Sequence, residues 1–218
     1  MIIDLNLMGK QVIIVGGGRE ADRKAEALFS QDCEIVVICD RASDKISQWG
    51  KEGRLTLKLQ KVSDGNFLTY FDRPILVMAA TDDIQLNREI VAAAKSLRCY
   101  AYSVDDPEFS DFSHPAIINL GDTFQIAVST GGKSPIMAKN IKHRLEPVLK
   151  ELIGKDDILK TQLQARIRKL AQNTLPSPQA RKQFFAMILS HGEINRLLNQ
   201  GKMDDAEALA LKLLQVHC

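Results

Sequence analysis

The chain has 218 residues, of which 45% are hydrophobic and 26% charged, a composition typical of a globular protein with a sizeable core. Its 29 Lys and Arg residues against 27 Asp and Glu residues give a net charge of +2. The basic residues are scattered through helical stretches, so we expect no nucleic-acid partner. No apolar run approaches the roughly 20 residues of a membrane span, so we expect no membrane or targeting segment.

A dinucleotide-binding pattern begins at the first long apolar run. Residues 12–15 are β-branched, three glycines follow, and a helix-like stripe starts at Ala21. Gly16 permits a sharp turn, Gly18 lets the backbone approach a pyrophosphate, and Ala21 allows close helix packing. Asp40 ends the second apolar run, where an acid accepts from a ribose hydroxyl. A purely structural glycine turn is the alternative, but the order of elements favours a cofactor site.

Strands and helices alternate up to about residue 113. We expect strands at 34–39, 55–59, 75–80 and 100–104, and a helix over 84–94. The run at 55–59 alternates with polar residues, which is typical of an outer strand, whereas the other runs are typical of strands covered on both faces. Right-handed crossovers then predict a parallel sheet of Rossmann type, with ligands outside the carboxyl ends of its strands. Asp40, Thr81 and Asp105 all fall at such ends.

The four cysteines form no C-x-x-C motif. Cys33, Cys39 and Cys99 lie in or beside apolar strands, which predicts buried free thiols, and Cys218 stands last in the sequence. This usage argues against a structural zinc or disulfide and predicts a reducing, cytoplasmic location.

A hairpin and a long helix follow the alternating part. Residues 117–119 and 124–129 predict the two strands of the hairpin. In the next segment, 129–135, Ser134 is a predicted helix cap with proline at the first helical position. This turn is expected to offer free backbone N–H groups and Lys133 to an anion, and a mere helix cap is the alternative.

From residue 154 onward the chain is predicted to be helical, with turns at 175–178, 191–192 and 201–202. The expected core positions of this part are Ile158, Leu163, Ile167, Leu170, Phe184, Phe185 and residues 187–189. We therefore divide the chain into a Rossmann domain at 1–113, a hairpin-plus-helix region at 114–153 and a helical C-terminal domain at 154–218.

Several motifs carry a family resemblance. They are the glycine-rich segment 16–25, Ala80-Thr81-Asp82-Asp83 with Asn87, Val104-Asp105-Asp106-Pro107, Pro115-Ala116-Ile117-Ile118, Ser129-Thr130-Gly131-Gly132-Lys133-Ser134-Pro135 and Arg181-Lys182-Gln183-Phe184-Phe185. Together they resemble the siroheme-synthase family of precorrin-2 dehydrogenases, some of which are also sirohydrochlorin ferrochelatases. The resemblance covers nearly the whole chain and implies the stand-alone form, because no methyltransferase segment follows.

The resemblance implies NAD-dependent oxidation of precorrin-2 to sirohydrochlorin by a homodimer that pairs through its second, small α+β dimerisation domain. Asp105 matches the family's catalytic aspartate, and a carboxylate near the nicotinamide is useful as a base when a ring proton leaves. A turn-forming aspartate is its structural alternative. The implied cofactor residues are Gly16, Gly18, Arg19, Glu20, Asp40, Arg41, Ala80 and Thr81. The implied substrate residues, which meet acetate and propionate groups, are Thr130, Gly131, Gly132, Lys133 and Ser134.

Two residues depart from the family pattern: Tyr102 replaces a common asparagine, and Thr130 stands where some members carry serine. Arg41 beside Asp40 keeps NADP open as the cofactor, although the acid disfavours a 2′-phosphate. His114 is either a metal ligand or a loop contact, so metal insertion stays open. The competing functions are a regulatory module that binds NAD(H) without catalysis and a chelatase without dehydrogenase activity.

Overall fold

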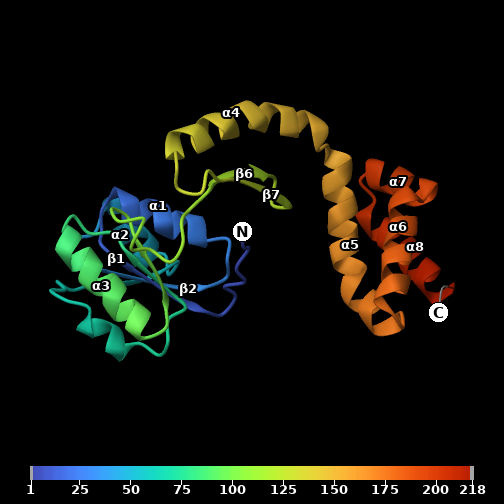
Figure 1. Cartoon of the computed structure of the whole chain (residues 1–218). Coiled ribbons are helices and arrows are strands. Elements are labelled where there is room, and N and C mark those ends of the chain that lie inside the picture. Colours follow the sequence, from blue (N-terminus) through green and yellow to red (C-terminus); the bar gives the residue numbers. More distant parts are fainter. Residues whose placement is uncertain (1, 217–218) are drawn as a thin grey trace. The chain divides into compact units, whose positions relative to one another are not determined.

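The computed structural model describes residues 2–216, and the chain divides between His114 and Pro115 into two compact units. The first unit contains β1 (Gln11–Val15), α1 (Arg19–Leu28), β2 (Glu34–Cys39), α2 (Asp44–Lys51), β3 (Thr56–Leu59), the 3-10 helix η1 (Asn66–Tyr70), β4 (Leu76–Ala79), α3 (Ile84–Ser96) and β5 (Tyr100–Ser103) (Figure 1). All five strands pair in parallel in the order β3-β2-β1-β4-β5.

Each face of this sheet is covered by helices. Alternate residues of β1 point to opposite faces, so Ile14 packs with α1 and α2, and Ile13 packs with α3 and η1. The strand order reverses between β1 and β4, and such a reversal opens a crevice at the carboxyl ends of the strands. The predicted Rossmann-type sheet, including β3 as an outer strand, is confirmed.

Two elements of the first unit escaped the sequence prediction. Helix α2 buries only Ile46 and Trp49, and η1 buries only Phe67 and Leu68. Two apolar residues give no readable helical period, so their formation depends on packing against the sheet. Cys33 is half-buried rather than buried as predicted, because it lies in the loop before β2.

The second unit begins with the predicted hairpin. Strands β6 (Ala116–Leu120) and β7 (Phe124–Val128) pair antiparallel, and Gly121 has a positive φ of 60° in the turn between them. Helix α4 (Pro135–Leu152) packs on both strands and buries Ala138. It begins as predicted, because the Ser134 hydroxyl accepts from the Met137 N–H at 3.2 Å.

Four further helices form a bundle with its own core: α5 (Lys155–Thr174), α6 (Pro178–Ser190), α7 (Gly192–Asn199) and α8 (Met203–Val216). Leu163, Ile167 and Phe184 are buried as predicted, whereas Leu170 is 48% exposed and Leu189 41% exposed. At Leu170 the prediction is wrong because α5 presents the neighbouring small Ala171 to the bundle core. Within residues 2–216, every helix is too short or too polar to cross a bilayer.

Candidate functional site

A cleft of about 890 Å³ lies in the first unit at the carboxyl ends of β1 to β4. Its lining consists of residues 15–18, 38–43, 60–63, 80–83 and 86. The predicted cofactor residues found in this lining are Gly16, Gly18, Asp40, Arg41, Ala80 and Thr81. Arg19 and Glu20 open helix α1 beyond the described lining, and Glu20 pairs with Arg23 at 2.7 Å.

The glycine turn fits a pyrophosphate. Gly16 has a φ of +125°, and a Cβ there would lie 2.2 Å from the Ala80 carbonyl oxygen. A Cβ on Gly17 would lie 2.0 Å from the Arg41 carbonyl oxygen, whereas a Cβ on Gly18 would meet open space. Gly18 is also the N-cap of α1 and has no side chain to occupy the first N–H groups. Uncapped N–H groups beside open space are what a phosphate needs at a helix N-terminus.

Sequence reasoning missed part of the lining. Gly17 stood at an unspecified position of the motif, yet it is as sterically restricted as Gly16. Ser43 caps α2 by accepting from the Ile46 N–H at 3.1 Å, and its own N–H donates to the Gly17 carbonyl at 2.8 Å. Residues 60–63 follow the outer strand β3. These residues line the cleft because β3 lies beside β2 in the sheet, and no local sequence pattern predicts that strand order.

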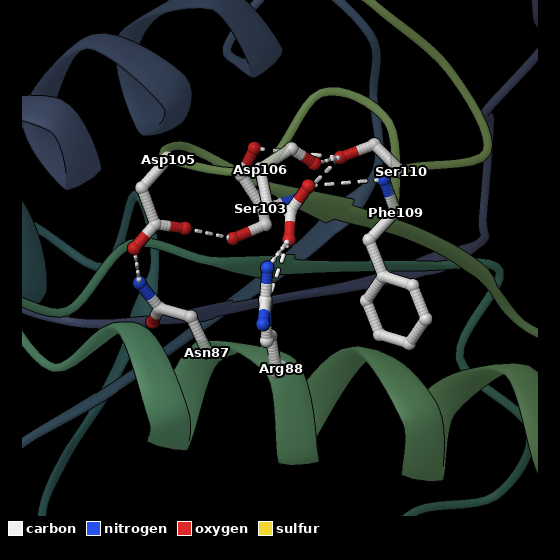
Figure 2. A network of polar contacts seen from close by, with 7 residues as sticks. All are labelled: Asn87, Arg88, Ser103, Asp105, Asp106, Phe109 and Ser110. Carbon is white, nitrogen blue, oxygen red and sulfur yellow. Dashed lines mark hydrogen bonds and ion pairs between the residues drawn. The ribbon is translucent and has the colours of Figure 1, made fainter.

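Asp105 follows β5, and its carboxylate is oriented by two buried side chains (Figure 2). Asn87 Nδ2 donates to Asp105 Oδ2 at 2.9 Å, and Ser103 Oγ donates to Asp105 Oδ1. Asn87 and Ser103 are both 0% exposed, whereas Asp105 itself is exposed. Buried donors therefore hold the carboxylate on one side, and its other side faces solvent.

Asn87 also connects Asp105 to the cleft. Its Oδ1 accepts from the Thr81 N–H at 3.1 Å and from the Thr81 hydroxyl at 2.7 Å. Its Nδ2 donates to the Thr81 carbonyl at 3.1 Å in addition to Asp105. One buried amide thus joins a residue of the cleft lining to the candidate catalytic carboxylate, and both of its polar atoms are satisfied.

The adjacent Asp106 is engaged in a different way. Its Oδ2 accepts from Arg88 Nε at 2.9 Å and pairs with the guanidinium Nη2 at 2.8 Å (Figure 2). Its Oδ1 accepts from the Phe109 N–H at 3.2 Å, and its carbonyl accepts from Ser110 Oγ at 2.8 Å. Asp106 therefore anchors the loop after β5 to α3, and Asp105 remains the carboxylate with an accessible side.

The predicted substrate loop lies in the second unit. Thr130 organises it, because its hydroxyl accepts from the Ser134 N–H at 2.9 Å and its carbonyl from the Lys133 N–H at 3.3 Å. The Gly131 N–H donates to Ser129 Oγ at 3.1 Å. These three N–H groups are therefore not free, contrary to the prediction, because the loop uses them to close its own turn. The side chain of Lys133 is exposed and is the cation this loop presents.

His114 packs against aromatic rings. Its ring centroid lies 4.8 Å from that of Tyr102 and 5.4 Å from that of Phe112, both edge to face. Desolvation by these contacts, and then the charges of Lys24 and Arg23, lower the pKa of His114 to about 4. Residues 2–216 contain no group of three or more His, Cys, Asp or Glu side chains arranged to hold a metal ion. His217 and Cys218 lie outside the described residues.

The sheet, glycine turn and cleft define a Rossmann-type dinucleotide-binding protein. Family comparison agrees, because residues 3–116 match the model of an NAD(P)-binding family. Residues 124–146 match the central region of sirohaem biosynthesis proteins, and residues 161–214 match the dimerisation region of sirohaem synthase. The chain therefore belongs to this NAD(P)-binding family and also carries the central and dimerisation regions of sirohaem synthase, as the sequence motifs predicted.

Individual relatives are consistent with this membership. Siroheme synthase from Nitrosococcus oceani is 30% identical over 205 residues, which are 94% of this chain and 42% of that protein. Siroheme synthase from Methylococcus capsulatus is 32% identical over 212 residues, 96% of this chain and 42% of that protein. The chain thus spans less than half the length of these relatives. The solved structure of SirC, a precorrin-2 dehydrogenase, has a similar fold, with a TM-score of 0.65 at 23% identity over 97% of this chain and 99% of that one.

Proposed function

We propose that the chain oxidises precorrin-2 to sirohydrochlorin with NAD as hydride acceptor. The observation that carries this proposal is the hydrogen-bonded path from Thr81 in the cleft lining through Asn87 to Asp105. This path connects an oriented carboxylate to the lining of the dinucleotide cleft. The names of its relatives, siroheme synthase and precorrin-2 dehydrogenase, support the choice of substrate.

Asp105 would serve as the base. Oxidation removes a hydride and a proton from the substrate, and the bound nicotinamide supplies the acceptor for the hydride. The exposed side of the Asp105 carboxylate would take the proton, while Asn87 and Ser103 hold its orientation. The products are then sirohydrochlorin, NADH and a proton, which balances the loss of two hydrogens.

NAD rather than NADP is the cofactor that the cleft favours. Asp40 lines the cleft at the end of β2 and is exposed to accept from a ribose hydroxyl. A carboxylate there disfavours a 2′-phosphate, although Arg41 beside it offers a positive charge. Gly16 and Gly18 would hold the pyrophosphate at the N-terminus of α1, and Ala80 and Thr81 would flank the nicotinamide half.

The second unit would supply substrate contacts and a dimer interface. Lys133, presented by the 130–134 loop, suits the carboxylate arms of a tetrapyrrole. Helix α4 carries an apolar stripe whose members Leu145, Val148 and Leu152 are 37%, 58% and 73% exposed. The match of residues 161–214 to a dimerisation region supports a homodimer, and we expect the exposed apolar stripe of α4 to be covered in it as well.

The test is to mix purified protein, precorrin-2 and NAD and to follow NADH absorbance, with NADP in a parallel reaction. The proposal predicts NADH formation that depends on precorrin-2, at a higher kcat/KM with NAD than with NADP. Tight NAD binding without NADH formation would instead support the regulatory module. Metal insertion into sirohydrochlorin without NAD, in the absence of dehydrogenation, would support the chelatase.

A further inference from the structure

A second group of side chains in the first unit lies outside the cofactor cleft. Lys24 on α1 places its ammonium nitrogen 4.3 Å from the centroid of the Tyr102 ring. Tyr102 stacks on Phe112 at 5.4 Å between ring centroids, and His114 packs edge to face against both. The three rings thus form one aromatic cluster beneath a single ammonium group, which we name the Lys24 cluster.

Lys24 has no carboxylate of its own. Among the ion pairs formed by residues 2–216, none includes Lys24, and the nearby Glu20 is already paired with Arg23 at 2.7 Å. Burial lowers the pKa of the Lys24 ammonium to about 8; the charge of Glu20 opposes this shift, and the charge of Arg23 adds a smaller lowering effect. A half-buried cation whose neighbouring carboxylate is already paired with another residue gains stability when a further anion arrives.

The Lys24 cluster lies close to Asp105. Tyr102 is the central residue of the cluster, and β5 carries it three positions before Asp105. Burial raises the pKa of Tyr102, and the charges of Glu20 and Asp105 raise it further while Arg23 lowers it. Lys24 thus contacts Tyr102 near the end of β5, and Asp105 follows three residues later, so a ligand as large as a tetrapyrrole would span the two groups.

We propose that Lys24, whose ammonium lies on the face of the Tyr102 ring, is a substrate-binding residue that pairs with a carboxylate arm of the tetrapyrrole. This inference rests on the proposed function, because it takes a tetrapyrrole with carboxylate arms as the substrate. The aromatic face holds the ammonium in place, and a charge-assisted hydrogen bond to the arriving carboxylate fixes one edge of the macrocycle relative to Asp105.

The test measures sirohydrochlorin binding by fluorescence quenching in wild type, Lys24→Met, Lys24→Arg and Lys58→Met. Lys58 is the matched control, because its ammonium lies 4.4 Å from the Phe71 ring centroid elsewhere in the first unit. We expect Lys24→Met to weaken sirohydrochlorin binding by about tenfold or more, as for loss of a hydrogen bond between charged groups. NAD affinity and the melting temperature are expected to match those of Lys58→Met, and Lys24→Arg is expected to restore most of the binding.

Equal sirohydrochlorin binding by wild type and Lys24→Met would overturn the inference and leave the proposed function intact. Weaker sirohydrochlorin binding by Lys24→Met would also overturn the inference if NAD affinity and the melting temperature fell as well, because Lys24 would then be a structural residue. Failure of the wild type to bind sirohydrochlorin would instead overturn the proposed function, and the inference with it.

Discussion

Replacing Asn87 by aspartate tests the buried path between the cleft and Asp105. Asn87→Asp keeps the oxygen that Thr81 uses but exchanges the donor 2.9 Å from Asp105 Oδ2 for a second carboxylate oxygen. Two unit charges at that distance repel by about 6 kcal/mol at an effective dielectric constant of about 20. Since Asp105 is exposed, screening by water reduces this to roughly half, so we expect a loss of about 3 kcal/mol in the free energy of unfolding at neutral pH.

The loss of stability in Asn87→Asp should become larger as pH rises. The folded variant relieves the repulsion by holding one proton between the two carboxylates, whereas the unfolded chain releases its protons above about pH 4. The folded state then binds more protons than the unfolded state, so the stability of the variant relative to wild type falls as pH rises and recovers in acid.

Trp49 gives a selective assay for this change. It is the only tryptophan of the chain and lies buried in the first unit, so its fluorescence in urea titrations reports unfolding of that unit. Asn66→Asp, the same substitution at an exposed site of the same unit, is the control and should follow wild type at every pH. If Asn87→Asp also follows wild type across the pH range, Asn87 and Asp105 are not paired as described.

Further substitutions test the glycine turn, His114 and the α4 stripe. Gly16→Ala should destabilise the first unit by about 2 kcal/mol through backbone strain and a carbonyl clash, whereas Gly18→Ala should keep its stability and weaken NAD binding; equal unfolding curves for the two variants would contradict this. The pKa of His114 is lowered to about 4, so the unfolded state takes up its proton first as pH falls below about 6.5, and stability is lost. His114→Gln should flatten that acid slope in urea titrations, and an unchanged slope would count against it. Leu145→Glu should convert a dimer to monomer in sedimentation velocity, whereas a persistent dimer would exclude the α4 stripe as an interface.

The fold was predictable from the sequence where its signals are local. Uninterrupted apolar runs such as 34–39 belong to strands that are buried on both faces, and the glycines after β1 mark the turn in which Gly16 passes close to the Ala80 carbonyl. Helix α2 was not predictable, because Ile46 and Trp49 are too few to show a period. Leu170 was predicted to face the bundle core but is exposed. The packing of α5 against its neighbouring helices, rather than hydrophobicity alone, decides which face of α5 is buried.

The candidate site was predictable only in part, because local sequence patterns do not encode contacts between distant elements. Asp40 and Thr81 follow apolar strands, so their position at the sheet edge could be inferred from the chain itself. The hydrogen bonds of Asn87 to Thr81 and Asp105 join α3 to two strand ends, and no spacing rule encodes such a contact. The same holds for residues 60–63, which reach the cleft because β3 pairs with β2.

The most direct test of the central claim compares wild type with Asp105→Asn at saturating precorrin-2 and NAD, with NAD affinity measured for both. An oriented carboxylate acting as base predicts a turnover about 10² to 10⁴ times slower in the variant, with NAD binding unchanged. Turnover by Asp105→Asn close to that of wild type would contradict the account and remove Asp105 from the reaction.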